Sequence, residues 1–555
     1  MKRMSLRFIT IVLFAVALPS FAQNQNGDIA ARVDKVFEQY DKPTSPGCAL
    51  AVINDGQIVY KRGYGMADLD HDIPIKPDTV FHVASVSKQF TAMAILLLAK
   101  QGKLSLDDEV RKYIPELRDF GQKITIRHLL HHTSGLRDQW NLLIMAGWRL
   151  SEDVVKDEDI LDLVSRMKEL NFKPGDQHLY SNTGYTLAAW IVKKVSGQSL
   201  REFSEANIFR PLGMANTFFR DNHAVVVKRQ AYGYQPGPVG TFRLSVPNYD
   251  TVGASSLLTT VEDLARWDQN FYDRRVGGDA VIEQMQRPGV LNDGQKIAYA
   301  LGVVAGKYRG LNVVEHSGGD AGYRSHLIRF PDQRFSVACL CNTGANPGQL
   351  SRRVADVFLA SQLAPEPPRL NQDSVSKLTE QELAGKAGAY WNSWTEDLAR
   401  VSTSDGKLNL SLPGLNAALT PLGGNRFQPA GQPLEVTFET ASNGAAQRLI
   451  IKPDGGKAMI FEAMPPADPV ARLAEYEGDY YSEEIDATYR VAIKDGKLAL
   501  MRKKNSPTQL QPAFRDGFST LSILGNIRFT RDAQSRINGF KLSAGRIRSF
   551  RFVRK

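Results

Sequence analysis

The sequence predicts an α+β protein whose main domain is followed by two small β-domains. Strand-like segments lie at residues 47–64 and 312–341, and a helix-rich stretch from about residue 85 to 285 separates them. The sheet is therefore assembled from distant parts of the chain, and its hairpins make it at least partly antiparallel. A proline-rich segment, 364–368, ends this part, and the sequence beyond it repeats itself.

Residues 1–22 have the three parts of a secretory signal peptide. A basic start precedes an apolar segment, 8–18, and a small-x-Ala cleavage site follows at 20–22. The apolar segment covers about half of a bilayer, so we expect a signal that is removed and no stable membrane span afterwards. We therefore expect a secreted protein, periplasmic if the host is Gram-negative.

A helix is expected over 28–41, followed by a β-hairpin over 47–64 that turns at Asn54-Asp55-Gly56. Cys48 lies in the first strand of this hairpin. The other two cysteines, Cys339 and Cys341, are two apart on a later strand and share one face. A bridge from Cys48 to either requires neighbouring strands, and we favour three buried free thiols.

Ser85-Val86-Ser87-Lys88 opens an apolar run, 90–99, that is too short for a membrane span and is typical of a buried helix. Residues three apart on a helix share a face, so Ser85 and Lys88 point into one site. The helix N-terminus favours a developing oxyanion, and an amine desolvated there can lose its proton and activate the hydroxyl. Ser85 is the predicted nucleophile. The alternative is a serine that only caps the helix.

Three further Ser-x-x-Lys matches occur in other contexts. Ser165 stands in a charged helical stretch, Ser374 follows the proline-rich segment, and Ser404 lies in a strand-turn-strand pattern. Only Ser85 follows an extended run, 79–84, and opens an apolar helix. Context therefore selects Ser85, although Ser374 also stands in a Ser-Val-Ser-Lys segment.

Tyr180-Ser181-Asn182 directly precedes a helix expected over 183–195. A tyrosine beside an ammonium acts as a phenolate-like base or as a proton shuttle, and an amide such as Asn182 can hold a substrate backbone. Taken alone, the segment fits a core tyrosine followed by a capping Asn182 as well as it fits a functional pair. Further helices are expected within 125–136 (ending before Gly135), from Thr260, and over 351–361.

His316-Ser317-Gly318-Gly319 ends a strand that begins at Asn312. A histidine can donate to a substrate oxygen or assist proton transfer, and the glycines let the backbone approach a ligand closely. On its own the segment is typical of a strand-end turn. The next strands, 323–330 and 335–341, join at Pro331-Asp332-Gln333.

Two similar units follow one another at an offset of 90 residues. Asp405-Gly406-Lys407-Leu408 matches Asp495-Gly496-Lys497-Leu498, and other identities keep the same spacing. Each unit has short strands between turn residues, which predicts two small antiparallel barrels or sandwiches. The expected divisions after the signal are a first domain over 23–365, a linker over 366–380, and β-barrel domains over 381–466 and 467–555.

In their order along the chain, three segments resemble the motifs of the serine β-lactamase and penicillin-binding-protein superfamily: Ser85/Lys88, Tyr180/Asn182 and His316/Gly318. The resemblance is closest to the class C-like branch of esterases and aminopeptidases, and residues 125–136 resemble a stretch common in that branch. It covers about residues 28–362. It implies an antiparallel five-stranded sheet flanked by helices, with the site between this sheet and an all-helical region.

The resemblance also implies acyl-enzyme chemistry. Ser85 attacks a carbonyl carbon, Lys88 and Tyr180 manage protons, and His316 completes the catalytic set. The backbone N–H groups of Ser85 and Gly319 hold the oxyanion.

Asn182, Ser317 and Gly318 bind the substrate in this interpretation. His316 replaces the lysine that many β-lactamases have at this position. Since a histidine is a poorer permanent counter-charge for a β-lactam carboxylate, efficient β-lactamase activity is not expected.

A hydrolase domain followed by two lipocalin-like β-domains is similar to the architecture of bacterial D-aminopeptidases, which also have a His-x-Gly third motif. The resemblance implies small peptide, amide or ester substrates, with D-stereospecific aminopeptidase activity as one option. Esterase, D-Ala-D-Ala carboxypeptidase and β-lactamase activities stay open, with peptidoglycan fragments as partners. So does a catalytically inactive relative that binds cell wall.

Composition and motifs argue against several other classes. The chain has 69 Lys and Arg against 59 Asp and Glu, and this excess is spread out, so no nucleic-acid partner is expected. His128, His131 and His132 lack the spacing of a His-Glu-x-x-His zinc site, and we expect no metal. Gly63-Tyr64-Gly65 lacks the following helix of a dinucleotide site, so we expect no cofactor. The absence of a Gly-x-Ser-x-Gly elbow argues against an α/β-hydrolase.

Overall fold

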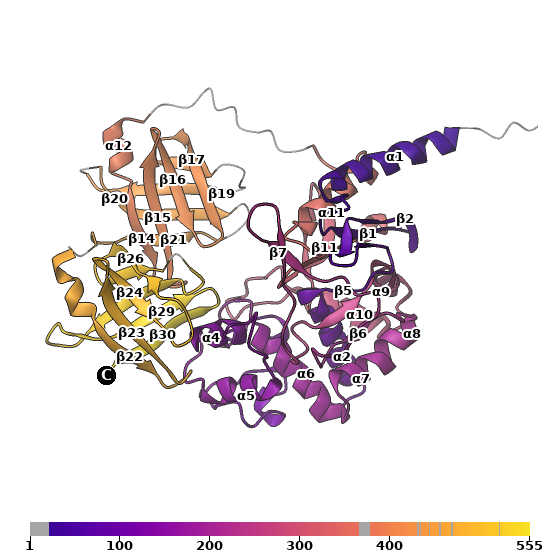
Figure 1. Cartoon of the computed structure of the whole chain (residues 1–555), viewed down its shortest axis with the longest axis horizontal. Coiled ribbons are helices and arrows are strands. Elements are labelled where there is room, and N and C mark those ends of the chain that lie inside the picture. Colours follow the sequence, from indigo (N-terminus) through magenta and orange to yellow (C-terminus); the bar gives the residue numbers. More distant parts are fainter. Residues whose placement is uncertain are drawn as a thin grey trace, which may run out of the picture.

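The computed structural model describes residues 21–365 and 378–555, apart from 430, 431, 433, 443, 454–456, 468, 469 and 521. Most of the predicted signal peptide, 1–22, and of the predicted linker, 366–380, lies outside the described residues. The described chain forms a mixed α/β domain followed by two barrel-like β-domains, which confirms the predicted fold class. In Figure 1 the two β-domains, orange and yellow, stand next to the mixed domain.

A six-stranded antiparallel sheet forms the centre of the first domain, in the order β10-β11-β12-β13-β1-β2. Its strands are β1 (Cys48–Asn54), β2 (Gln57–Tyr64), β10 (Val304–Tyr308), β11 (Leu311–Asp320), β12 (Tyr323–Phe330) and β13 (Phe335–Cys341). The expected number of five strands is wrong. The extra strand is β10, which pairs with β11 through a tight turn at Arg309-Gly310, where both residues have positive φ.

The first hairpin has the predicted turn. Asp55 and Gly56 have φ angles of 50° and 76°, as a two-residue hairpin turn requires. The expectation of three free thiols is wrong, because β1 pairs with β13 and places Cys48 opposite Cys341. These two residues form a disulfide with a Cα–Cα distance of 4.0 Å across 293 residues of sequence, and Cys339 is a buried free thiol.

Helices cover both faces of the sheet and build a separate helical region. They are α1 (Phe21–Phe37), α2 (Lys88–Lys100), α3 (Ile126–Leu130), α4 (Gln139–Met145), α5 (Asp157–Arg166), α6 (Asn182–Ser196), α7 (Leu200–Ser204), α8 (Arg210–Leu212), α9 (Val261–Asp273), α10 (Gly278–Gln286) and α11 (Pro347–Phe358). Short strands connect them: β3 (Met66–Asp68), β4 (Ile73–Pro74), β5 (Phe81–His82), β6 (Phe218–Phe219), β7 (Tyr234–Pro236), β8 (Phe242–Leu244) and β9 (Leu257–Thr259).

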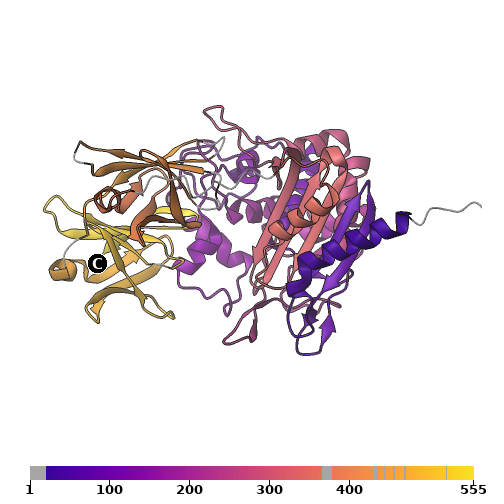
Figure 2. The same cartoon turned by 90° about the horizontal axis from the view of Figure 1, so that it is seen from above.

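Alternation along β1 separates two hydrophobic cores. Leu50 and its alternate neighbours pack with α1 and α11, and Figure 2 shows these helices lying across one face of the sheet. Ala51 and its alternate neighbours face the other core, which contains Phe90 of α2 and Trp267 of α9. The N-terminus of α2 therefore lies on this second face, between the sheet and the helical region.

Helix ends follow the capping signals of the sequence, with one exception. α6 ends at Gly197, whose φ is 76°, and the Thr260 hydroxyl accepts a hydrogen bond from the N–H of Asp263 at the start of α9. The helix expected within 125–136 is too long, because α3 ends at Leu130. The following turn leaves His132 at a φ of 57° and turns the chain away from the helix axis.

The first β-domain is a closed antiparallel barrel after a short helix, α12 (Glu380–Ala384). Its strands are β14 (Gly388–Asn392), β15 (Asp397–Ser404), β16 (Lys407–Leu412), β17 (Leu415–Gly423), β18 (Arg426–Pro429), β19 (Leu434–Thr440), β20 (Ala446–Pro453) and β21 (Met459–Ala463). The second β-domain is a nine-stranded sheet that curls without closing: β22 (Gly478–Ser482), β23 (Ala487–Lys494), β24 (Lys497–Met501), β25 (Thr508–Gln509), β26 (Gln511–Phe514), β27 (Gly517–Ser519), β28 (Asn526–Arg531), β29 (Ile537–Ala544) and β30 (Ile547–Arg554).

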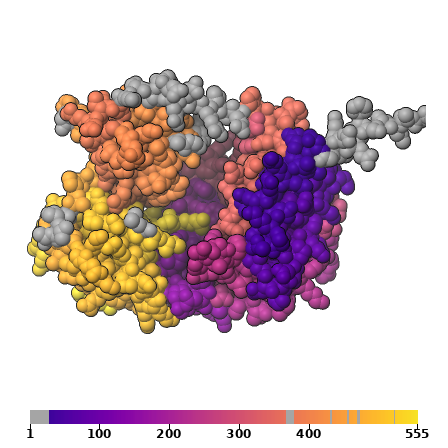
Figure 3. Space-filling model, turned by 45° about the horizontal axis from the view of Figure 1, so that its top comes forward, coloured from indigo at the N-terminus to yellow at the C-terminus, as the bar shows by residue number. Residues whose placement is uncertain are grey.

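The second barrel packs directly against the helical region of the first domain. Its apolar residues belong to the same buried cluster as α4 and α6. The Tyr489 hydroxyl donates to the Met145 carbonyl at 2.6 Å, and Arg137 pairs with Glu484 at 2.7 Å, with both charges buried. The space-filling view shows a hollow between the barrels and the first domain (Figure 3). No helix among the described residues is long and apolar enough to cross a membrane.

Candidate active site

Ser85 stands in a single 3-10 turn, Ala84–Ser87, that leads directly into α2. The Ser87 hydroxyl donates to the Ala84 carbonyl and accepts from the N–H of Leu257, which fixes this turn against β9. The Lys88 ammonium nitrogen lies 3.0 Å from the Ser85 hydroxyl oxygen. The predicted serine and lysine therefore share one face at the start of the helix.

Lys88 is completely buried, and its Nζ lies within hydrogen-bond distance of three oxygens. Besides Ser85 Oγ, these are Asn182 Oδ1 at 2.9 Å and the Ala254 carbonyl at 2.6 Å. Burial lowers the pKa of Lys88 well below its usual value, and the nearby Arg546 lowers it further. A neutral amine has two N–H donors and one lone pair. With the two carbonyl-type oxygens accepting, the lone pair is free to take the proton of the Ser85 hydroxyl.

Asn182 is held in this orientation by Asp138, the N-cap residue of α4. One oxygen of Asp138 accepts both the backbone N–H and the side-chain amide of Asn182, each at 2.8 Å. The amide nitrogen therefore points to Asp138, and the amide oxygen points to Lys88. Asp138 is almost fully buried and was not expected from the sequence.

Tyr180 lies over Lys88, with the Lys88 Nζ 4.9 Å from its ring centre. Its hydroxyl oxygen is buried and has no hydrogen-bond partner in the described part of the chain. Burial raises the pKa of Tyr180 above its usual value, and the facing Ser85 hydroxyl acts in the opposite direction. The phenol therefore stays protonated, which favours the proton-shuttle role over a standing phenolate.

His316 is buried in β11 and is neutral. Its Nδ1 lies 2.6 Å from the Ser317 carbonyl, so Nδ1 carries the proton, and Nε2 accepts from the Tyr299 hydroxyl at 3.0 Å. Burial, with Lys88 nearby, lowers the pKa of His316 to about 3. The imidazole is therefore a polar neutral group at neutral pH and not a fixed positive charge. Tyr299, which like Asp138 was not predicted from the sequence, holds this tautomer.

Gly318 brings β11 against the start of α2. A Cβ atom at Gly318 would lie 2.3 Å from the Val83 carbonyl and 3.0 Å from the Ser85 backbone nitrogen, so no side chain fits. A Cβ at Gly319 would lie at ordinary contact distance from Arg324. Ser317, Gly318 and Gly319 also line a cavity of about 600 Å³. The third motif therefore borders this cavity and also contacts the start of α2, whereas Ser85 and Asn182 are not among the residues that line the cavity.

The other Ser-x-x-Lys matches are in different surroundings. Ser165 donates back to the Asp162 carbonyl within α5, and Ser404 pairs with Lys407 across the β15–β16 hairpin. Ser374 lies outside the described residues. Neither of the described matches stands at the start of a buried helix.

The three histidines near α3 have structural contacts. His128 closes a capping box with Thr125, and His132 Nδ1 accepts from the N–H of Ser181. Within the described ranges, the one cluster of three side chains able to hold a metal consists of the cysteines, two of which form the disulfide.

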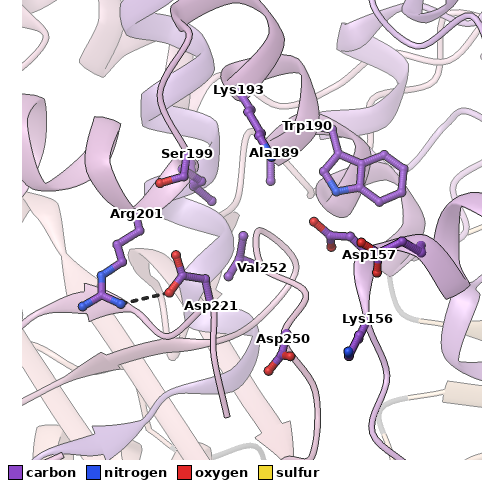
Figure 4. A pocket seen from close by; sticks show the side chains of 12 residues that line it. Lys156, Asp157, Ala189, Trp190, Lys193, Ser199, Arg201, Asp221, Asp250 and Val252 are labelled. Atoms are coloured by element: carbon purple, nitrogen blue, oxygen red, sulfur yellow. Dashed lines mark hydrogen bonds and ion pairs between the residues drawn. The ribbon is translucent and has the colours of Figure 1, made fainter. Parts of the chain in front are cut away.

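A separate cavity of about 300 Å³ lies between α5, α6 and α7 (Figure 4). Its acidic residues include Asp221, which pairs with Arg201 at 2.9 Å, and Asp250, which pairs with His223 at 2.7 Å. None of the predicted site residues lines this cavity. It is therefore distinct from the site at Ser85.

A serine beside a buried lysine, with a tyrosine above them and a glycine-containing strand alongside, defines a serine hydrolase of the Ser-x-x-Lys class. The chain belongs to the β-lactamase family: the model of the family described as Beta-lactamase matches residues 33–362.

Similar proteins include a penicillin-binding protein and a D-aminopeptidase. The chain is 32% identical over 428 residues to penicillin-binding protein 4* of Bacillus subtilis, covering 74% of this chain and 93% of that protein. It is 27% identical over 441 residues to a D-aminopeptidase of Gluconobacter oxydans, covering 80% of each. These relatives support an enzyme that is a serine hydrolase.

Solved structures agree on the fold. The octameric penicillin-binding protein homologue from Pyrococcus abyssi superposes with a TM-score of 0.55 at 23% identity, covering 86% of this chain and 98% of that chain. The D-amino acid amidase from Ochrobactrum anthropi SV3, solved with L-phenylalanine amide, gives a TM-score of 0.52 at 22% identity over 60% of this chain and 99% of that one.

Proposed function

We propose that this protein is an exported serine hydrolase that acts on small amide or ester substrates through an acyl-enzyme at Ser85. The observation that carries the proposal is the fully buried Lys88 amine, 3.0 Å from the Ser85 hydroxyl and held by two further oxygens. The same burial that makes its charged form unfavourable makes the amine a base.

In the proposed reaction, Ser85 Oγ attacks the carbonyl carbon as Lys88 takes its proton. The backbone N–H groups of Ser85 and Gly319 stabilise the oxyanion. Tyr180 passes a proton to the leaving group, whose bond to the carbonyl carbon breaks. Water then attacks the ester carbonyl and gives one proton to Lys88. The bond between the acyl carbon and Ser85 Oγ breaks, Oγ takes that proton, and the acid is released.

Asn182, Ser317 and Gly318 are proposed to bind the substrate. Asp138 fixes the amide of Asn182, and that amide still has a second N–H and a second acceptor lone pair to offer to a substrate. Neutral His316 is proposed to hydrogen-bond the substrate or assist proton transfer, and it cannot supply a lasting positive charge for a β-lactam carboxylate.

The relatives leave two substrate classes. The D-aminopeptidases support a D-stereospecific aminopeptidase, and penicillin-binding protein 4* supports a D-Ala-D-Ala carboxypeptidase or β-lactamase. A general esterase is a third option. Peptidoglycan fragments are proposed partners for the peptide-cleaving options.

Activity profiling of the purified full-length protein tests the proposal. The panel contains D-amino-acid amides, stem-peptide analogues, small esters and penicillins, with Ser85→Ala as the control. Turnover of at least one class that disappears in Ser85→Ala supports the acyl-enzyme. No turnover of any class together with binding to cell-wall sacculi would instead identify an inactive wall-binding relative.

Export is tested separately. We expect the mature protein to begin after residue 22 and to be found outside the cytoplasm, in the periplasm of a Gram-negative host. N-terminal sequencing of the fractionated protein decides this, and an intact N-terminus in the cytoplasmic fraction would contradict it.

A further inference from the structure

The second barrel sends a hairpin turn into the active site. β29 and β30 are joined by Gly545-Arg546, and Gly545 has the positive φ of 58° that such a two-residue turn needs. Asn171 fixes this turn from the first domain. Its side chain donates to the Arg546 carbonyl and accepts from the N–H of Arg548, each at 2.9 Å. The position of Arg546 is therefore built into the docked structure.

The Arg546 guanidinium lies against two groups of the site. Its centre is 4.4 Å from the ring centre of Tyr180, and Nη1 lies 3.3 Å from Asp138 Oδ2. That Asp138 oxygen already accepts two hydrogen bonds of 2.8 Å from Asn182. The contact to Arg546 is the longest of the three, so Asp138 binds Asn182 more closely than it binds Arg546.

The guanidinium keeps donors for a ligand. An arginine has five N–H donors, and Asp138 is the one side-chain acceptor that Arg546 has among the described residues. The Arg546 side chain is 40% exposed, whereas that of Asp138 is 1% exposed. The remaining donors therefore lie on the open side, over Tyr180.

The charges around Arg546 favour an anion there. Lys88 hydrogen-bonds Ser85 and His316 belongs to the third motif, and burial lowers the pKa of both, that of His316 to about 3. Arg324, which pairs with Gly319 across the sheet, is a further cation next to the third motif. Arg546 is thus a permanent cation beside the reacting groups, and its one carboxylate neighbour, Asp138, is shared with Asn182. A carboxylate would bind this fork through charge-assisted hydrogen bonds, whereas an ammonium would be repelled.

We propose that Arg546 of the second barrel binds a carboxylate on the substrate and so makes the enzyme prefer acyl donors that carry an anionic group. This inference rests on the proposed Ser85 acyl-enzyme and narrows its substrate class. It favours the carboxylate-bearing options over an amide whose free amine lies at this position. In this proposal Arg546, in the second barrel, supplies the positive charge that a lysine at the position of His316 would give.

Three matched esters test the proposal on the full-length protein. The 4-nitrophenyl esters of glutarate, pentanoate and 5-aminopentanoate place a carboxylate, a methyl group or an ammonium at the same end of similar acyl chains. A second pair puts the charge on the leaving group: the pentanoyl esters of 4-hydroxybenzoate and of its methyl ester. We expect kcat/KM of the wild type to be highest for a carboxylate-bearing ester and lowest for the ammonium.

Arg546→Gln should lower kcat/KM for the preferred anionic ester by about ten- to hundredfold and change the neutral ester by less than about threefold. Arg546→Lys should keep part of the preference. Arg536→Gln is the matched control. It removes an exposed arginine of the same barrel that pairs with Asp532, and should leave kcat/KM unchanged for both the anionic and the neutral ester. Equal losses for all esters in Arg546→Gln would show a role only in supporting Asp138, and would overturn the proposal.

Two further outcomes are decisive. If Arg546→Gln does not fold, the wild-type ratios still decide, because equal or better turnover of the neutral or ammonium ester contradicts the proposal. Hydrolysis that persists in Ser85→Ala would contradict the acyl-enzyme itself. If kcat/KM is equal for the anionic, neutral and ammonium esters while hydrolysis depends on Ser85, the result contradicts the role of Arg546 but not the acyl-enzyme.

Discussion

At the scale of single residues, burial sets the protonation states on which the chemistry depends. Lys88 and His316 are both enclosed, and burial lowers both pKa values, which favours the neutral form of each. The pKa of His316 falls to about 3, so this imidazole is neutral at neutral pH. Tyr180 is enclosed as well, and its pKa rises. The site therefore combines an amine whose charged form is disfavoured, a neutral imidazole and a protonated phenol, a set of groups that can pass protons.

A pH profile should assign the acid limb of activity to Lys88. A base works only when neutral, so kcat/KM falls as the pH drops through the folded pKa of Lys88. His316 has a pKa of about 3 and stays neutral through this range. In His316→Gln we expect kcat/KM to fall by about ten- to hundredfold while the acid limb keeps its position. An acid limb that disappears or shifts by a full pH unit or more would make His316 the titrating group.

Asp138→Asn should separate orientation from stability. Asparagine caps a helix about as well as aspartate, so the melting temperature should change little. The new amide puts N–H donors opposite those of Asn182, so we expect the Asn182 amide to lose its orientation and kcat to fall by roughly tenfold or more. A fall in melting temperature with unchanged kcat would contradict this role for Asp138.

The sequence predicted the motif residues and missed their supports. Ser85 and Lys88 share a helix, so local spacing was sufficient to place them together. Asp138 reaches Asn182 across 44 residues, and Tyr299 reaches His316 through a loop of no marked pattern. Arg546 lies in the turn before β30, in a domain whose docking against the site no local pattern indicates. Such contacts depend on tertiary packing that local patterns do not contain.

At the scale of elements, turn and cap signals were reliable, and pairings over long distances were not. The hairpin at Asp55-Gly56 and the end of α6 at Gly197 lie where the sequence placed them. The sixth strand, β10, and the pairing of β1 with β13 did not follow from any local pattern. The pairing of β1 with β13 also places Cys48 opposite Cys341, where the two form the disulfide.

Removal of the disulfide should destabilise the first domain. Cys48→Ser opens a covalent loop of 293 residues and should lower the free energy of unfolding by about 2–5 kcal/mol. Cys339→Ser, which changes the neighbouring free thiol, is the matched control and should cost less. Denaturant unfolding under non-reducing conditions measures both. Equal stability of Cys48→Ser and the wild type would contradict the bridge.

At the scale of the whole molecule, the second barrel is part of the active-site wall. The internal repeat predicted two β-domains, but their docking depends on contacts such as Arg137 with Glu484, which are 347 residues apart. Glu484 also accepts the backbone N–H of Lys168 at 2.8 Å. The two domains therefore share a buried charged contact next to Asp138, and docking of the barrel is coupled to the site.

Glu484→Gln should loosen this docking. Loss of one buried charge leaves Arg137, 1% exposed, without its main partner, and we expect a loss of about 3–5 kcal/mol in stability. Glu483→Gln changes the neighbouring, largely exposed glutamate that pairs with Lys168 and should change the stability much less. Thermal unfolding of the two variants provides the comparison. Similar melting temperatures would show that the buried pair does not hold the barrel in place.

Covalent labelling of the nucleophile tests the central claim most directly. An activated-serine probe or an acylating substrate is added to the full-length protein, and the adduct is located by peptide mapping in a mass spectrometer. We expect the adduct on the peptide containing Ser85, with loss of labelling and a drop in turnover of at least about 10³-fold in Ser85→Ala. An adduct on Ser374, which stands in the second Ser-Val-Ser-Lys, or undiminished turnover in Ser85→Ala, would contradict the assignment of Ser85.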